Sequence, residues 1–320
     1  MLARTLLLPA LCWVCVAQVS LQGVVSGYVL DRRSASVRPL LGAPGAAYLG
    51  GALALPWGVT AAAVRGSRDI GVAISDEQPR HVYLLHGFAA KVAATPLGAA
   101  IADGDRVFLS GDGSAAAIVS SSRRQVQLIA NLTSSPAVAD PVTLDVRGEI
   151  TAVAVSDLGC ALAAGADERS GQVMELCIAA PGTVVTLLDK DGFHPTAAAW
   201  LDNRSFAVSD AASNQVLLFT GSDGSAPTVL LDHTSGIESP VGVAAVDSST
   251  LAVVNTRTAA LVVARTDESS PARIFSLPAQ PMGIDALDTP SILVSNTLLN
   301  SPLLLIDVRR DYAAFFVPAN

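Results

Sequence analysis

Short runs of alternating apolar residues recur along the second half of this chain. Four of these runs begin equivalent segments, at residues 150–155, 195–200, 240–245 and 281–286. Each run is followed by a polar turn that carries Asp or Asn, and then by two further apolar runs. The runs are short and rich in Val, and their hydrophobic period is close to two. This pattern predicts β-strands rather than helices.

The interval between the segments indicates how the strands are grouped. Pro195 and Pro240 are 45 residues apart, and Pro240 and Pro281 are 41 residues apart. A period of this length is typical of four-stranded propeller blades and also of solenoids built from paired helices. The alternating pattern excludes the helical solenoids. The sequence therefore predicts an all-β propeller of four-stranded blades.

The second run of each segment ends on a residue suited to a tight turn. Residues 205–210, 250–255 and 291–296 end on Asp210, Asn255 and Asn296. Asp and Asn hydrogen-bond to their own backbone and tolerate turn conformations. We interpret these three residues as repeat turn positions, and a ring of shared ligands is the alternative interpretation.

Chain length favours one closed ring with seven blades. Residues 18–320 number 303, and a mean interval of 43 residues gives about seven blades. Residues 26–31 and 36–41 predict an N-terminal hairpin in an incomplete or shared blade that helps to close the ring. Closure matters because an open array would expose the edges of its first and last sheets. Six blades is the alternative.

The first 17 residues predict a secretory signal peptide. Arg4 supplies a short positive region, and the apolar stretch 6–16 is too short to span a bilayer comfortably. We expect cleavage after Ala17, which leaves a single propeller domain of residues 18–320. No later segment is long and apolar enough to predict a membrane span, so we expect a secreted or periplasmic protein without stable membrane insertion after cleavage.

Cleavage leaves two cysteines, Cys160 and Cys177. If residues 160–165 and 172–178 form a hairpin in which 165 pairs with 172, then position 160 lies opposite position 177. A non-hydrogen-bonded pair of this kind brings two cysteines close enough to bridge. In an oxidising compartment the sequence predicts a disulfide within one blade. Two buried free thiols are the alternative.

Charge and composition exclude one class of partner. The net charge is −8 and the chain has only two lysines, so it offers no basic run that could neutralise phosphates. We therefore expect no nucleic-acid partner. Hydrophobic residues make up 51% of the chain but aromatic residues only 5%, which suits thin, closely packed sheets.

Motifs for catalysis or cofactor binding are missing from the sequence. The four histidines do not have the spacing of a zinc motif, and the chain has neither a Gly-x-Ser-x-Gly elbow nor a phosphate-binding loop. The nearest approach to a cation site is Asp189 and Asp191 before Gly192, which is weak because a third oxygen ligand and a distal Glu are missing. We predict no catalytic and no cofactor-binding residues, and an inter-strand turn at 189–192.

The segment 240–255 resembles the NHL and YVTN type of bacterial propeller repeat. That repeat has a Pro-x-Gly-Val-Ala run, an Asp turn and a strand that ends in Asp; here 240–247 is Pro-Val-Gly-Val-Ala-Ala-Val-Asp, and 250–255 ends in Asn255. Residues 195–210 and 281–296 are similar copies. The resemblance implies a propeller that serves as a binding platform, a lyase or a lactonase, and most often a non-catalytic surface that binds a protein, peptide or glycan.

Two functional hypotheses of different class follow. The first is an exported non-catalytic binding scaffold that uses loops on one face of the disk or the mouth of its central channel. The alternative is a metal-dependent, lactonase-like hydrolase with a Ca or Zn ion in the central channel, which would need no other cofactor. Its ligands would come from several blades, with Asp210, Asn255 and Asn296 as candidates, although their register predicts turns near the rim.

Overall fold

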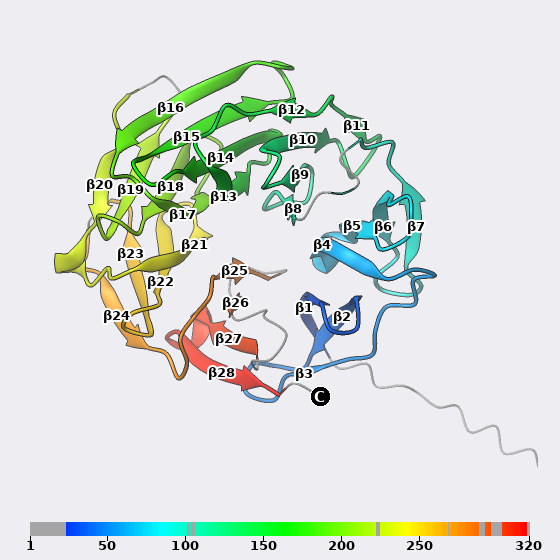
Figure 1. Ribbon diagram of the computed structural model, residues 1–320. Coiled ribbons are helices and arrows are strands. Elements are labelled where there is room, and N and C mark those ends of the chain that lie inside the picture. Colours follow the sequence, from blue (N-terminus) through cyan, green and yellow to red (C-terminus); the bar gives the residue numbers. More distant parts are fainter. Residues whose placement is uncertain are drawn as a thin grey trace, which may run out of the picture.

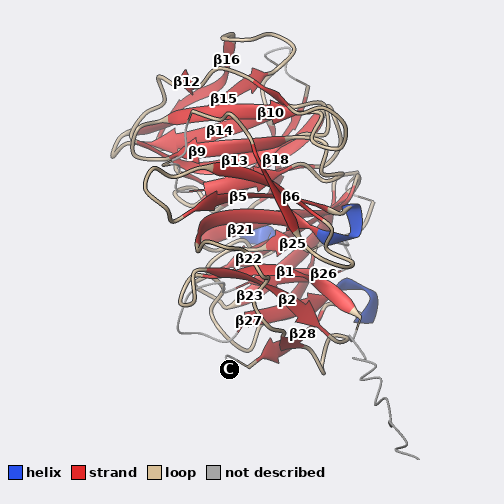
Figure 2. Ribbon diagram, turned by 90° about the vertical axis from the view of Figure 1, so that its right-hand side faces the viewer, coloured by secondary structure: helices blue, strands red, loops and turns tan. Residues whose placement is uncertain are grey.

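The structure is a computed structural model that describes residues 24–100, 103, 106–221, 225–267, 269–287, 292–295 and 303–318. Its sheets are arranged in a ring, which confirms the prediction of an all-β propeller (Figure 1). Viewed from the side, the sheets pack face to face around the disk (Figure 2). The helical elements among the described residues are three single turns, η1 (Gly66–Arg68), η2 (His233–Ser235) and η3 (Val308–Arg310).

Six sheets are complete blades, each with its first strand innermost. The first is β4 (Val59–Arg65), β5 (Ile70–Ser75), β6 (Val82–His86) and β7 (Ala93–Pro96). The second is β8 (Arg106–Leu109), β9 (Ala116–Ser120), β10 (Gln125–Ala130), β11 (Ala137–Val138) and β12 (Val142–Thr143). Both β11 and β12 pair with β10, so together they fill the outermost strand position.

The other four blades have four strands each. The third is β13 (Glu149–Val155), β14 (Cys160–Ala166), β15 (Ser170–Cys177) and β16 (Val184–Asp191). The fourth is β17 (Pro195–Trp200), β18 (Ser205–Asp210), β19 (Gln215–Thr220) and β20 (Thr228–Leu231). The fifth is β21 (Pro240–Asp247), β22 (Thr250–Asn255), β23 (Ala260–Arg265) and β24 (Arg273–Ser276). The sixth is β25 (Asp285–Ala286), β26 (Ile292–Ser295), β27 (Leu303–Asp307) and β28 (Ala313–Val317).

A three-stranded sheet lies between the sixth blade and the first (Figure 1). It consists of β1 (Val25–Asp31), β2 (Ser36–Leu41) and β3 (Tyr48–Leu49). The first two strands are the N-terminal hairpin that the sequence predicts. The described residues thus form six blades of four strand positions and one smaller sheet, and seven complete blades are not shown.

Side chains of this N-terminal sheet close the ring. Val29 and Leu40 pack against Leu303 and Leu305 of the sixth blade. On the other side, Val37 packs with Val59 and other buried residues of the first blade. Burial of apolar side chains on both faces therefore holds the sheet in the ring. We call the contact with the sixth blade the closing seam.

A β-bulge near the start of the innermost strand recurs around the ring. The register shifts at Thr60, Thr151, Thr196 and Val241, and at Ser26 in the N-terminal sheet. A bulge bends the strand and re-aims a side chain. The hydroxyl of Thr151 donates to the carbonyl of Pro195 in the next blade at 2.6 Å, and that of Thr196 donates to the carbonyl of Pro240 at 2.7 Å. The bulges thus place hydrogen bonds between neighbouring blades.

Several predictions fall on parts of the chain outside the described residues. These are the signal peptide at 1–17 and the turn position Asn296. No helix among the residues described is long and apolar enough to cross a membrane.

Candidate functional site

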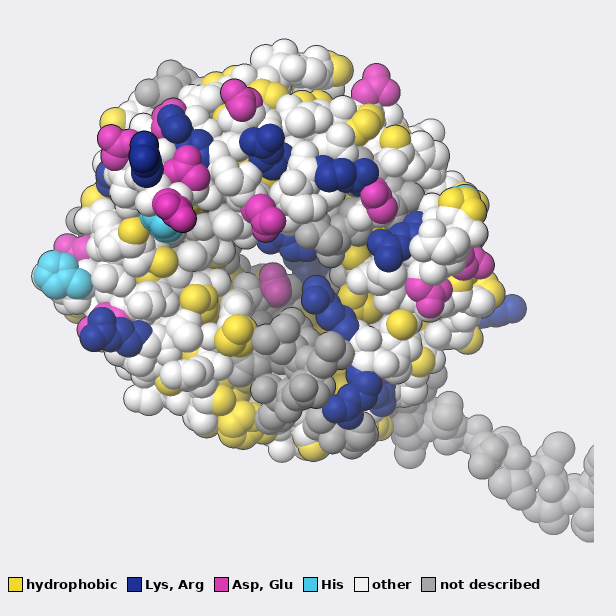
Figure 3. Space-filling view, in the orientation of Figure 1, with side chains coloured by type: hydrophobic (Ala, Val, Ile, Leu, Met, Phe, Trp, Pro, Cys, Tyr) yellow, Lys and Arg dark blue, Asp and Glu magenta, His cyan; other side chains and the backbone are white. Residues whose placement is uncertain are grey.

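The innermost strands end around one opening of the central channel, which we call the mouth. A cavity of about 460 Å³ lies there. The ends of β8, β13, β17, β21 and β25 form most of its wall, together with Arg65 and Arg68 from the first blade. The space-filling view shows the channel open at the centre of the disk, with basic and acidic side chains around it (Figure 3).

Small side chains keep the mouth wide. Ala154, Ala198, Ala199, Ala244 and Ala245 line the cavity. The innermost strands pair on one side only, so the other edge of each backbone faces the channel. The cavity therefore has backbone donors and acceptors along its wall, and charged side chains at its rim.

Four aspartates lie in successive turns between the first and second strands of their blades. They are Asp112, Asp157, Asp202 and Asp247, at constant intervals of 45 residues, and all four line the cavity. The repeat therefore places one carboxylate per blade at the mouth over four consecutive blades. We call these four residues the acidic arc.

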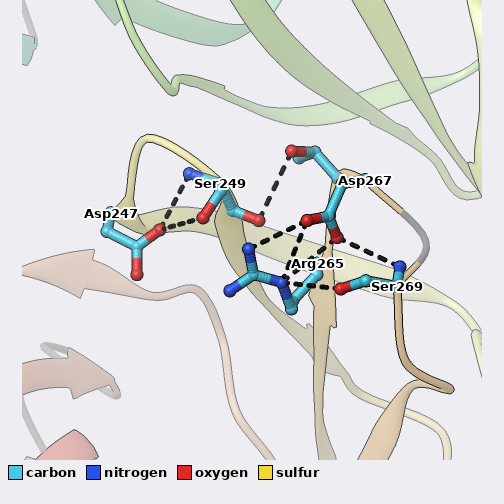
Figure 4. Close-up of polar contacts among 6 residues, drawn as sticks. Asp247, Ser249, Arg265, Asp267 and Ser269 are labelled. Atoms are coloured by element: carbon cyan, nitrogen blue, oxygen red, sulfur yellow. Dashed lines mark hydrogen bonds and ion pairs between the residues drawn. The ribbon is translucent and has the colours of Figure 1, made fainter.

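Local hydrogen bonds explain why aspartate suits these turns. The Oδ1 atom of Asp202 accepts from the backbone N–H of Arg204 and of Ser205, both at 2.6 Å. The Oδ1 atom of Asp247 accepts from the N–H of Ser249 at 2.8 Å and from its hydroxyl at 2.9 Å (Figure 4). A side-chain acceptor two residues before a donor is the usual Asx turn.

A hydrogen bond joins the second and third blades at the mouth. The backbone N–H of Asp112 donates to Oδ1 of Asp157 at 3.0 Å, and the hydroxyl of Ser114 donates to the carbonyl of Asp157 at 2.9 Å. Burial raises the pKa of the Asp157 carboxyl, and the nearby Asp112 carboxylate raises it further. Burial alone would also raise the pKa of Asp112, but hydrogen bonds from Ser114 and Ser110 lower it below its ordinary value. The two neighbouring carboxyls therefore differ in acidity.

Arginines from the N-terminal sheet and from the first and second blades also line the channel. A second cavity of about 300 Å³ is lined by Arg32, Arg65 and Arg106, and it shares Arg65 and Asp285 with the cavity at the mouth. The guanidinium of Arg65 reaches the sixth blade, where it donates to the carbonyl of Ala286 at 2.7 Å. The guanidinium of Arg106 donates to the carbonyls of Ile150 and Thr151.

Arg32 has the place in its sheet that an aspartate has in other blades. Asp157, Asp202 and Asp247 each come seven residues after the residue that precedes the bulge, and Arg32 comes seven residues after Val25. The N-terminal sheet thus carries the opposite charge at this turn. We call Arg32, Arg65 and Arg68 the basic arc.

Asp285 lies between the two cavities. Its side chain is exposed to the channel, whose walls displace part of the surrounding water. This desolvation raises the pKa of the Asp285 carboxyl, whereas the positive charge of Arg65 acts in the opposite direction. The carboxyl and the basic arc are therefore electrostatically linked.

The predicted disulfide is confirmed. Cys160 and Cys177 are bonded, with their Cα atoms 4.0 Å apart. The register is the predicted one, with Gly165 opposite Gln172 and Cys160 opposite Cys177. Both backbone groups of Cys160 bond to Ser156, on the side away from Cys177. The two cysteines are therefore a non-hydrogen-bonded pair, which is the geometry that brings side chains closest.

The weak metal candidates lie far from the channel, on the outermost strand β16. Asp189 forms an ion pair with Arg147 at 3.2 Å and accepts from the amide of Gln172 at 2.9 Å. The hydrogen bond from Arg147, followed by that from Gln172, lowers the pKa of the Asp189 carboxyl. Asp191 ends the same strand and is exposed. The structure does not bring the pair together with further oxygen ligands among the residues that it describes.

The two turn positions within the described residues are buried in their own blades. Asp210 ends β18 and accepts from the backbone N–H groups of His194 and Ala212 at 2.9 and 3.0 Å. Asn255 ends β22 and donates to the carbonyl of Gly236 at 2.7 Å. Neither residue lines either channel cavity. They are therefore placed as blade turns and do not converge on a common ion.

One group of potential metal ligands occurs within the described part of the chain. It consists of Cys160, Glu175 and Cys177, and the disulfide between the two cysteines prevents them from acting as thiolate ligands. This group lies within the third blade, and the described residues show no second group of three such side chains close together.

The strand pattern identifies the blades but misses the acidic arc. The constant interval of 45 residues between Asp112, Asp157, Asp202 and Asp247 is visible in the sequence and could have shown it. The basic arc has no comparable signal, because Arg32, Arg65 and Arg68 are brought to the mouth from two different sheets.

Solved structures share this fold. Hydrazine synthase from Kuenenia stuttgartiensis aligns at 13% identity and a TM-score of 0.62, over 91% of this chain and 98% of its own. A protein from Lactobacillus plantarum aligns at 14% identity and a TM-score of 0.60, over 92% and 94%. Virginiamycin B lyase from Staphylococcus aureus aligns at 12% identity and a TM-score of 0.57, over 83% and 86%.

At these identities the likeness shows the propeller fold alone. No family model matches this chain. No curated protein matches it either.

Proposed function

We propose that this chain is an exported, non-catalytic propeller that binds its ligand at the mouth of the central channel. The observation that carries the proposal is the cavity of about 460 Å³, whose wall comes from five innermost strands and whose rim has both charges. Ligand sites are typically concave spaces of about 300–1,000 Å³ with a few polar groups. A protein, peptide or glycan could insert one small group there.

Export is the second part of the proposal. The sequence of residues 1–17 supports it, and so does the disulfide between Cys160 and Cys177, since disulfides persist in oxidising compartments. A secreted or periplasmic location would also expose the mouth to extracellular ligands.

The repeat class belongs to the proposal as well. We assign the segments that begin at Pro195, Pro240 and Pro281 to the NHL and YVTN type, and we count the N-terminal sheet as an incomplete seventh blade. The support is the proline that begins β17 and β21, the Asp at the end of β21 and in the turn after β17, and the position of the sheet in the ring.

The alternative, a lactonase-like hydrolase, would require a Ca or Zn ion in the channel. Asp210 and Asn255 do not reach the cavity, and Asp202 and Asp247 already accept hydrogen bonds within their turns. We therefore favour binding over catalysis. Elemental mass spectrometry of the exported protein, purified without chelator, decides between them: about one Ca or Zn per chain would favour the hydrolase.

Filling the mouth tests the binding proposal. Asn203 is an exposed turn residue that lines the cavity, so Asn203→Trp should obstruct it. Thr133 is exposed in the turn between β10 and β11, outside both channel cavities, so Thr133→Trp is the matched control. Ligands would be found by saturation-transfer NMR with a library of peptides and oligosaccharides.

We expect ligands of the unmodified mature protein to bind Thr133→Trp equally, and to bind Asn203→Trp at least about tenfold more weakly, which corresponds to about 1.4 kcal/mol. Equal binding by both variants, or an absence of ligands for the unmodified protein, would reject the mouth as the site.

A further inference from the structure

We propose that the basic arc makes the mouth a receptor for a single carboxylate group, carried by an acidic sugar or by a peptide C-terminus. This inference rests on the proposed function and names the chemistry that the same site recognises. One turn of the ring carries a positive charge where the equivalent turns carry a negative one. Arg32 has the turn position at which three complete blades carry Asp157, Asp202 and Asp247.

The three arginines are gathered by neighbouring elements. Arg65 ends β4, Arg68 lies in η1 directly after it, and η1 packs against β1, which precedes Arg32. Arg65 lines both cavities, Arg68 lines the one at the mouth and Arg32 lines the second. The concentration is unusual for this chain, whose net charge is −8. A local group of arginines therefore lies beside the acidic arc and Asp285 at the cavities of an acidic protein.

Each arginine has a distinct part at these cavities. Arg65 is held by its hydrogen bond to the carbonyl of Ala286, so we assign it a positioning role. Arg32 and Arg68 are exposed turn residues at the edge of the cavities, so their guanidinium groups can reach an incoming group. The planar guanidinium matches a carboxylate with two parallel hydrogen bonds.

The acidic arc restricts which anion can enter. Asp112, Asp157, Asp202 and Asp247 line the same cavity as Arg65 and Arg68. A ligand with several negative charges would approach these carboxylates and be repelled, since like charges in a partly enclosed site repel strongly. A carboxylate carries one negative charge, whereas a phosphate monoester carries about two at neutral pH. The mouth therefore favours the carboxylate.

Two sources supply this group, and binding assays can separate them. The peptide probe is N-acetyl-tetra-alanine, with its C-terminal amide as the neutral control. The sugar probe is the methyl glycoside of galacturonic acid, which carries one carboxylate, with its methyl ester as the neutral control. Glycerol phosphate is the doubly charged comparison. Dissociation constants would be measured by calorimetry on the mature protein, residues 18–320, at low salt.

Matched charge variants locate the binding group. Arg32→Gln and Arg68→Gln each remove one charge from an exposed side chain at the cavities. Arg169→Gln removes one charge from the exposed turn between β14 and β15, outside both channel cavities, and is the control. Thermal unfolding verifies that all three variants fold.

We expect at least one carboxylate probe to bind. Its neutral derivative and glycerol phosphate should bind at least about tenfold more weakly. Arg32→Gln or Arg68→Gln should lose about tenfold in affinity for that probe. Binding of only one probe identifies peptide or sugar as the source. Equal binding of a probe and its neutral derivative, binding of neither carboxylate, or a failure of both Arg32→Gln and Arg68→Gln to weaken binding more than Arg169→Gln would overturn the inference. If neutral ligands bind and Asn203→Trp weakens their binding, the proposed function stands although this inference fails.

Discussion

At the scale of single residues, the two carboxyls that join the second and third blades respond differently to pH. Asp157 accepts a hydrogen bond from the backbone of Asp112 and is partly enclosed by protein. Its pKa is raised above the ordinary value of 3.8, chiefly by burial. Between the unfolded and the folded pKa, the folded state holds more protons than the unfolded state. The contribution of Asp157 to stability therefore falls as pH rises through that interval.

Asp157→Asn should remove this loss of stability with rising pH, because the amide carries no charge. Its oxygen still accepts the hydrogen bond from the backbone N–H of Asp112. We expect the melting temperature of the variant to exceed that of the unmodified protein by about 1–3 °C at pH 7. The difference should disappear well below pH 3.8, where the carboxyl is protonated in both states. Asp140→Asn, at an exposed position, controls for the loss of one charge. A difference that does not change between pH 4 and pH 7 would contradict the assignment.

The sequence predicts local turn chemistry well at this scale. Asp210 and Asn255 lie at the ends of β18 and β22, as the pattern of the second runs indicates. The pattern cannot predict that Arg65 donates to Ala286, because that contact joins residues 221 positions apart. Side chains that span the channel depend on how the ring closes.

At the scale of strands, the disulfide joins two neighbouring strands of the third blade. Cys160 begins β14 and Cys177 ends β15, 17 positions further along the chain. Closing a loop of this size reduces the freedom of the unfolded chain by about 3 kcal/mol. We expect the double variant Cys160→Ser, Cys177→Ser to lose about that much unfolding free energy in denaturant titrations.

A thiol titration provides the control for the disulfide prediction. The mature protein, denatured without reductant, should show no reactive thiol, and the same protein should show two after reduction. Two reactive thiols before reduction would show that the bond does not form in solution.

The bulged strands give a second prediction at this scale. Thr196→Val should cost about 1 kcal/mol, because the carbonyl of Pro240 loses its hydroxyl donor. The fifth blade has Val241 at the equivalent bulge, so valine is compatible with the fold there. Thr228→Val, on the exposed start of the outermost strand β20, is the comparison for the same substitution. Equal losses of unfolding free energy in the two variants would argue against a stabilising hydrogen bond between Thr196 and Pro240.

Strand boundaries were the most predictable part of this fold. Residues 70–75, 205–210 and 250–255 coincide with β5, β18 and β22. These segments are short apolar runs that end in turn residues, so local chemistry determines their limits. The split outermost position of the second blade, where β11 and β12 are two residues each, has no such local signal.

At the scale of the whole molecule, the ring depends on the closing seam. Leu305 is fully buried there and packs with Val29 and Leu40 of the N-terminal sheet. Leu305→Ala should cost about 2–5 kcal/mol, since it removes a buried side chain and leaves a cavity. Hydrogen exchange should also become faster in β1 and β2, because they lose part of their packing against the sixth blade.

Leu251→Ala is the matched control for this prediction. Leu251 is equally buried, but it packs between the fourth and fifth blades. We expect a similar loss of stability without faster exchange in β1 and β2. Unchanged exchange in β1 and β2 for Leu305→Ala would show that the seam does not hold the N-terminal sheet.

The number of blades could not be settled from the sequence because closure involves distant segments. The repeat interval predicts about seven units, whereas the structure has six complete blades and a three-stranded sheet. Val29 and Leu40 meet Leu303 and Leu305 across more than 260 positions of sequence. No local pattern specifies such a contact. The site shares this limit, since the basic arc comes from two sheets and only the acidic arc follows the repeat.

The two ends of the chain lie in different sheets, one on each side of the closing seam. No strand of β1–β3 pairs with a strand of β25–β28. The first sheet to leave the ribosome or an export channel therefore waits for the last blade before one of its faces is covered. For the same reason, a circular permutant that joins residues 318 and 24 by a linker and opens between two other blades would keep every sheet intact. The position of the termini is thus one of several equivalent places to cut this ring.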